Sequence, residues 1–180
     1  MFGPLDAAIL FVGLAPGMHG ANRTGRPFTG DYAGILLYKT LHKYGLASHA
    51  GSDDPADGLV LRDCRISNAV KCLPPQNKPT PAEIRQCNRF LANELRLHPP
   101  RVIVALGRIA HDAVLAALEL KGRAYPFGHH ASHDLPSGVK LIDSYHCSRY
   151  NTQTKRLTDT MFEAVVADAV AAAGKIRKAR

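Results

Sequence analysis

The sequence has no apolar run long enough to cross a lipid bilayer, which takes about 20 consecutive apolar residues. Its first six residues form neither the basic region nor the apolar centre of a signal peptide. We therefore expect a chain without a membrane partner that works in the cytoplasm.

Cysteine is scarce in the chain, with four residues among 180, and no two of them form a CxxC pair. A disulfide framework is not expected in an intracellular protein. Each of the four is therefore interpreted first as a small, buried apolar residue: Cys64, Cys72, Cys87 and Cys147.

The sequence also lacks the G-x-G-x-x-G and P-loop patterns, which weakens the hypothesis of a nucleotide-binding α/β protein that acts on small molecules.

Acidic residues are outnumbered, because 15 Asp and Glu stand against 23 Lys and Arg and leave a formal net charge of +8. The resulting pI of about 9.5 favours a polyanionic partner. The basic end, residues 175–180, is expected to be a disordered tail.

Apolar runs predict strands over residues 8–14, 64–70, 101–106 and 139–145. Helical patterns follow at 34–44, 81–96, 108–118 and 159–173, and Thr80, Pro81 and Glu83 form a typical helix start with a capping box. Strands that alternate with helices indicate an α/β fold. We expect a three-layer αβα sandwich with a central, mainly parallel four-stranded sheet, formed as one domain over residues 1–174.

A long loop, residues 15–31, follows the first predicted strand and is rich in Gly, Asn and Arg. Loops of this length without secondary structure are uncommon in compact domains unless they are functional. Open α/β folds bind ligands beyond the carboxyl ends of their strands, where this loop begins. The sequence therefore predicts a ligand site at this edge of the sheet.

Three segments that leave this edge carry distinctive motifs: GLAPG…HGANRTGRPFTGD from Gly13, NAVKCLPPQNKPTPAEI from Asn68 and SYHCSRYNTQTKRLT from Ser144. Together and in this order they resemble the uracil-DNA glycosylase superfamily, in particular its type-5 branch, over about residues 9–162. The resemblance implies a monofunctional DNA glycosylase, expected to be a monomer. Such an enzyme hydrolyses the N-glycosidic bond of uracil, and of other deaminated bases, in double- or single-stranded DNA during base excision repair.

The resemblance implies a pocket for the flipped base. The Asn68 amide offers one donor and one acceptor, which match O4 and N3–H of uracil and oppose the reversed pattern of cytosine. Phe28 resembles the aromatic residue on which the base stacks, although a plain core Phe is the alternative. Leu14 and Ala15 are assigned to the base-binding residues, and Ala15 occupies a position where other glycosylase types carry Asp or Asn to hold water.

The resemblance also implies catalytic roles. His146 lies in a His-x-Ser-x-x-Asn-Thr pattern, from which a neutral imidazole can donate a hydrogen bond to O2 of the departing base. Because Ala15 cannot position water, Asn22 and Asp31 are the candidates for that task. Asp31 can also stabilise the oxocarbenium ion, and its alternative role is to cap the following helix.

Basic and polar residues of the same loops are expected to contact DNA. Ser148, Arg149 and Tyr150 resemble the segment of the family that enters the minor groove. The full set of predicted DNA-binding residues is Arg23, Arg26, Lys71, Ser148, Arg149 and Tyr150.

Two metal sites come into question. His129 and His133 are four residues apart, which aligns ligands only on a helix, whereas Gly128 and Pro136 predict a loop. We interpret residues 124–138 as a polar loop near the DNA.

Cys72 and Cys87 match two of the thiolate ligands of a 4Fe–4S cluster in the resembled family, but four are normally needed. The cluster is either incomplete in this chain or absent.

A non-catalytic α/β protein that binds damaged DNA is the main alternative to a glycosylase. It would share the basic surface and the loops but would release no base.

Overall fold

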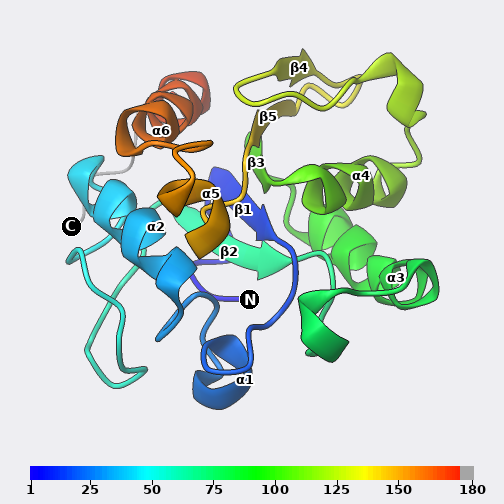
Figure 1. Cartoon of the computed structure of the whole chain (residues 1–180). Coiled ribbons are helices and arrows are strands. Elements are labelled where there is room, and N and C mark those ends of the chain that lie inside the picture. Colours follow the sequence, from blue (N-terminus) through cyan, green and yellow to red (C-terminus); the bar gives the residue numbers. More distant parts are fainter. Residues whose placement is uncertain (175–180) are drawn as a thin grey trace.

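The computed structural model describes residues 1–174 and contains one five-stranded sheet in the order β2-β1-β3-β5-β4 (Figure 1). The predicted tail, residues 175–180, lies outside the described residues. The strands β1, β2, β3 and β5 pair in parallel, whereas β4 runs antiparallel to β5. Their bounds are β1 (Ile9–Gly13), β2 (Cys64–Asn68), β3 (Val102–Leu106), β4 (Ser132–Asp134) and β5 (Lys140–Ser144).

Helices cover both faces of the sheet, and the predicted three-layer α/β fold is confirmed (Figure 1). On one face, α2 (Tyr32–Lys43) and α6 (Asp159–Ala173) pack over Ile9 and Phe11 of β1. On the other face, α3 (Pro81–Leu97) and α4 (Arg108–Ala117) pack over Leu10 and Val12. Successive residues of a buried strand point to opposite faces, which explains why the strand runs are apolar throughout.

The sheet has one strand more than the four predicted from the sequence. The additional strand, β4, lies within the segment that we expected to be a histidine-rich loop. It has three residues, of which the outer two are exposed and the middle one is half-buried. A short, polar edge strand has no apolar run by which to be recognised, so its pairing with β5 can only be seen in three dimensions.

Short helical turns occupy the loops at the carboxyl edge of the sheet. They are α1 (Ala21–Thr24) after β1, η1 (Pro75–Asn77) after β2 and α5 (Arg149–Gln153) after β5. A fourth turn, η2 (Gly122–Ala124), follows α4. None of the helices within the described part of the chain is both long and apolar enough to span a membrane.

The predicted capping box at the start of α3 is confirmed. The Glu83 backbone N–H donates to Thr80 Oγ1 at 3.2 Å, and the Thr80 backbone N–H donates to Glu83 Oε2 at 2.6 Å. Hydrogen bonds from the Thr80 backbone N–H and hydroxyl to its carboxylate lower the pKa of Glu83. Two of the backbone donors that every helix start leaves unsatisfied thereby find acceptors.

Replacing this cap should destabilise the protein measurably. We expect Thr80→Ala to lower the free energy of unfolding by about 1 kcal/mol, because the Glu83 backbone N–H loses its acceptor. Urea denaturation followed by circular dichroism measures the change. Ser137→Ala, in an exposed turn, is the control and should leave the midpoint unchanged; equal midpoints for both variants would contradict a stabilising cap.

Candidate active site

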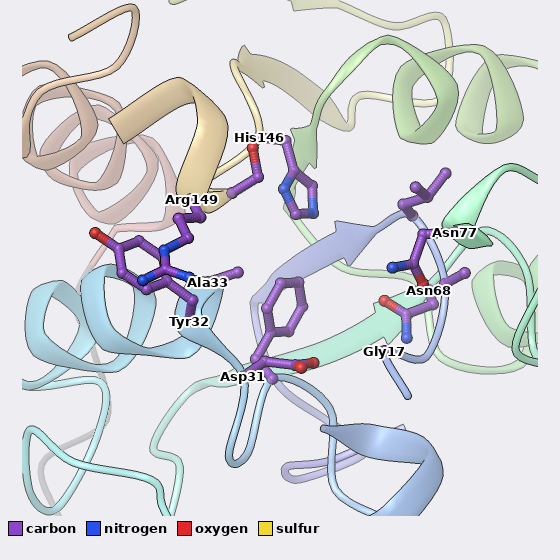
Figure 2. A pocket seen from close by; sticks show the side chains of 12 residues that line it. Gly17, Asp31, Tyr32, Ala33, Asn68, Asn77, His146 and Arg149 are labelled. Carbon is purple, nitrogen blue, oxygen red and sulfur yellow. The ribbon is translucent and has the colours of Figure 1, made fainter. Parts of the chain in front are cut away.

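A cavity of about 420 Å³ lies beyond the carboxyl ends of the parallel strands. Strand pairing brings its walls together, because Gly13 at the end of β1 is in register with Asn68 at the end of β2. His146 enters from the segment after β5, and the start of α2, with Tyr32 and Ala33, lies across the cavity from Asn68 (Figure 2). The cavity is lined by Leu14, Ala15, Gly17, Phe28, Asp31, Tyr32, Ala33, Asn68, Asn77, His146, Ser148 and Arg149.

Asn68 lines this cavity and carries an unsatisfied polar atom. The residue is only 7% exposed, and its Oδ1 is buried without a hydrogen-bond partner among the described residues. A buried acceptor without a donor costs about 1–3 kcal/mol of stability. Such an atom on a cavity wall is the acceptor that a bound N–H group would satisfy.

Phe28 lies against the same wall, with its ring centroid 6.0 Å from that of His146. A Cβ on Gly13 would lie 2.5 Å from Asn68 Oδ1 and 2.7 Å from Phe28 Cζ, so only glycine lets the amide and the ring approach the strand end. Phe28 is 7% exposed and packs into the core with its inner surface while it lines the cavity. The core and stacking interpretations of this residue are therefore compatible.

His146 is held mainly through its backbone. The Asn151 side-chain amide donates to the His146 carbonyl at 2.8 Å, and the preceding Tyr145 N–H donates to His129 Nδ1 at 3.2 Å. Burial lowers the pKa of His146 to about 4, and no carboxylate opposes this effect. The imidazole is therefore neutral at neutral pH and retains one N–H donor.

Asp31 turns its carboxylate toward the loop after β1 instead of capping α2. It occupies the N-cap position, but its side chain makes no capping hydrogen bond. A Cβ on Gly17 would lie 2.5 Å from Asp31 Oδ2, and one on Gly20 would lie closer still to the same atom. Burial raises the pKa of Asp31, and His19 partly opposes the shift.

A cation and an aromatic ring meet at the mouth of the cavity. The Arg149 guanidinium lies over the Tyr32 ring, 5.3 Å from its centroid (Figure 2). Ser148 begins α5 by accepting a hydrogen bond from the Asn151 backbone N–H, so Arg149 lies in the first turn. Tyr150, which is 70% exposed, is the next residue along this outer surface.

Three of the candidate residues in the loop after β1 do not line the cavity. Asn22 and Arg23 are exposed on α1 and do not line the cavity, and Arg23 Nε donates to the His19 carbonyl at 3.0 Å. Arg26, expected to contact DNA, is instead 7% exposed and pairs with Asp57 at 2.6 Å. Its guanidinium also donates to Thr29 and Ser52, so it braces the loop from inside. Sequence alone does not distinguish a buried arginine from an exposed one in a basic loop.

Lys71 is also engaged within the protein. Its Nζ donates to Ser67 Oγ at 2.7 Å and to Glu94 Oε2 at 3.3 Å. Glu94 in turn lies 3.7 Å from Nε of the fully buried Arg65. Lys71 thus pairs with the buried Glu94 carboxylate. Its ammonium group is therefore less available to a DNA phosphate than the sequence suggested.

Asn77 lines the cavity beside Asn68 and was missed in the sequence (Figure 2). It lies at the end of η1, in a left-handed conformation with a φ of 55°. Asparagine tolerates this conformation better than most residues, so the sequence NKP after two prolines indicated only a turn. Its position in the loop after β2 was the one sequence feature that could have identified Asn77 as a residue of the cavity.

Cys72 and Cys87 line a second hollow, of about 410 Å³, between the loop after β2 and α3. Cys72 is exposed, whereas Cys87 is buried and accepts from the Lys71 backbone N–H at 3.5 Å. Burial raises the pKa of the other two thiols, Cys64 and Cys147, which lie in the hydrophobic core. A 4Fe–4S cluster needs four ligands. The described residues bring two to this hollow and so do not complete its donor set.

Comparison with known proteins gives a consistent family. The model of the uracil DNA glycosylase superfamily matches residues 1–170. A type-5 uracil-DNA glycosylase of Thermus thermophilus is 53% identical over 174 residues, which are 96% of this chain and 79% of that protein. The Pyrobaculum aerophilum type-5 enzyme is 42% identical over 173 residues, 96% of this chain and 75% of that protein.

The Mycobacterium bovis type-5 uracil-DNA glycosylase is 46% identical over 169 residues, 92% of this chain. The chain spans 63% of the length of that relative. The family model covers all three loops that form the cavity, and each of the three relatives covers more than nine tenths of this chain. The chain belongs to the uracil-DNA glycosylase superfamily.

Proposed function

We propose that the protein excises uracil from DNA by hydrolysing the N-glycosidic bond, the first step of base excision repair. The observation that carries this proposal is the unpartnered, buried Asn68 Oδ1 on the wall of a cavity that also holds Phe28 and a neutral His146. The relatives named uracil-DNA glycosylase support it from sequence. A target base has to leave the duplex stack before it can enter this cavity.

Asn68 recognises the edge of the flipped base. Its Oδ1 accepts the N3–H of uracil, and its Nδ2 donates to O4. Cytosine has no proton on N3 and carries an amino group at C4, so both partners would be mismatched. Phe28 supplies the surface on which the ring stacks. We assign no side chain to the recognition of other deaminated bases, such as purines. Their removal is therefore proposed only as a secondary activity.

His146 stabilises the leaving base. As the bond between C1′ and N1 breaks, its electron pair moves onto the base, and negative charge grows on O2. The neutral imidazole donates a hydrogen bond to this oxygen, which a positioned donor in a dry site does effectively. The sugar is left as an oxocarbenium ion that water attacks at C1′.

Asp31 is the better placed of the two candidates for handling this water. It lines the cavity, whereas Asn22 is exposed on α1. Its carboxylate accepts a proton as the water oxygen bonds to C1′ and stabilises the positive sugar electrostatically. Burial raises the pKa of Asp31, which makes its carboxylate a stronger base.

DNA contacts are assigned to the exposed rim. Arg149 and Ser148 line the cavity, Tyr150 follows them on α5 and is exposed, and Arg23 is exposed on α1. Arg26 and Lys71 are left out, since their charges are paired internally.

The protein is proposed to act as a cytoplasmic monomer, and size-exclusion chromatography with light scattering tests its mass. No step of the reaction passes through an iron–sulfur cluster.

The experiment that tests this function is release of free base from an oligonucleotide with one uracil. The protein should yield free uracil and an alkali-labile strand at that position. Tight binding of the intact oligonucleotide without base release would instead favour the non-catalytic damage-binding alternative.

Asn68→Ala should impair both turnover and selectivity. The base edge would enter the cavity without its partners, so we expect kcat/KM for uracil to fall by roughly 10- to 100-fold, as the loss of a buried polar partner implies. Single-turnover cleavage of uracil- and cytosine-containing strands measures both properties. Asn93→Ala, on the exposed surface of α3, is the matched control. An unchanged rate in Asn68→Ala would remove this residue from base recognition.

The rate should not follow an ordinary histidine titration. Because the pKa of His146 is lowered to about 4, its neutral form persists from pH 8 to below pH 6. We expect a constant single-turnover rate over that range and a loss in acid, as His146 and the carboxylate of Asp31 become protonated. His146→Ala should lower the rate about 10²- to 10³-fold. A rate step near pH 6.5 in the native protein that vanishes in His146→Ala would contradict a neutral donor.

Binding should weaken with salt because phosphate contacts release counterions. Arg149→Ala should reduce the slope of log K against log salt by about one, measured by fluorescence anisotropy between low and physiological salt. Arg89→Ala, on α3, is the control for net charge. Equal slopes for the native protein and Arg149→Ala would remove Arg149 from the DNA surface.

A further inference from the structure

A buried cluster of two histidines and one aspartate lies outside the cavity, between α4 and the edge pair β4–β5. His111 of α4, His133 of β4 and Asp143 of β5 bring ligating atoms within 4.8 Å of one another. Asp143 and His111 are fully buried, and the His133 side chain is 13% exposed. The proposed reaction uses none of the three.

His133 has a free nitrogen inside this cluster. Its Nε2 is buried without a hydrogen-bond partner among the described residues and lies 3.6 Å from Asp143 Oδ2. That distance is too long for a hydrogen bond but close to the separation of two ligands of one metal ion. In the tautomer that is protonated on Nδ1, this nitrogen has a lone pair to offer to a metal ion.

His111 is already oriented as a metal ligand would be. Its Nε2 faces the Tyr125 carbonyl at 2.9 Å and so carries a proton, while Nδ1 faces Asp143 Oδ1 at 2.7 Å. Metal-binding histidines usually donate their second ring N–H to a backbone carbonyl or carboxylate, which fixes the ring. The Gly128 backbone N–H also points to Asp143 Oδ2, at 3.4 Å.

Aromatic side chains enclose the cluster. The rings of Tyr125 and Phe127 pack edge-on against His133 and His111 at centroid distances of 5.8 and 5.5 Å. Two imidazole nitrogens and one carboxylate form a donor set that suits zinc and similar divalent ions. Three protein ligands leave a fourth position for water.

We propose that His111, His133 and Asp143 bind one divalent transition-metal ion of the zinc class. The ion takes the place of the proton between His111 Nδ1 and Asp143 Oδ1, so binding releases one proton to solvent. With bonds of about 2.0 Å in tetrahedral geometry, ligand atoms stand about 3.3 Å apart. The His111–Asp143 pair has to open by about 0.6 Å from its distance in the structure.

This ion would be structural. Asp143 lies three residues before His146, and its backbone N–H and carbonyl are already bound to the Ala131 carbonyl and the His130 N–H, each at 2.8 Å. A metal would add a link between α4, β4 and β5 at this point. It would stiffen the segment that delivers His146 without touching the base, so the inference stands apart from the proposed function.

The test uses tag-free full-length protein titrated with Co²⁺ and Zn²⁺. We expect one ion per chain after gel filtration, a visible d–d spectrum for Co²⁺, release of about one proton per Zn²⁺ and a higher Tm. His133→Ala should abolish all four, since the His111–Asp143 pair alone does not hold the ion. His130→Ala is the matched control, because His130 lies in the same segment but pairs with Asp168.

Thiolates are also ligands for such ions, so the titration and its comparison with His133→Ala and His130→Ala are repeated in a Cys72→Ser/Cys87→Ser variant. Retention of one ion without sulfur-to-cobalt charge-transfer bands supports the proposal. Absence of stoichiometric binding at micromolar metal in this variant overturns it, as does equal binding by His133→Ala. If His133→Ala fails to fold, the cobalt spectrum and the proton release of the thiol-free variant decide the question.

Discussion

The backbone hydrogen bonds that pair β1 with β2 and β3 determine where the polar groups of the cavity lie. They align Gly13 with Asn68, and the pairing of β3 with β5 aligns Leu106 with Ser144, which stands two residues before His146 in the sequence. Four parallel strands therefore end at one edge, and their following loops have to meet there. Helices on both faces bury the sheet and hold this register, because a shift by one residue would turn each strand's side chains to the opposite face.

Charge is distributed unevenly between scaffold and cavity. Arg26 and Lys71 pair with carboxylates inside the scaffold and hold loops in place. The cavity, in contrast, keeps a neutral His146, the Asp31 carboxylate and Asn68 with its unpartnered Oδ1. Polar groups left unmatched in this way destabilise the free protein. A bound uracil would satisfy them. The arrangement that slightly weakens the free fold therefore favours binding of the flipped base.

The sequence predicted well what depends on local pattern. The strands and helices followed from apolar runs, and the Thr80 cap followed from its motif. Motif positions also led to Asn68, Phe28 and His146, which the structure brings to one cavity. What failed depends on distant partners: the pairing of Arg26 with Asp57, the edge strand β4 and the exposure of Asn22. Such contacts join segments that no periodicity or capping signal connects.

The central claim is that the Asn68 amide reads the edge of uracil. Side-chain amide resonances of the ¹⁵N-labelled protein, titrated with free uracil and then with free cytosine, test it most directly. The account predicts that the Asn68 resonances shift with uracil and remain in place with cytosine at the same concentration. Equal shifts with both bases, or none with uracil while other cavity residues respond, would contradict it.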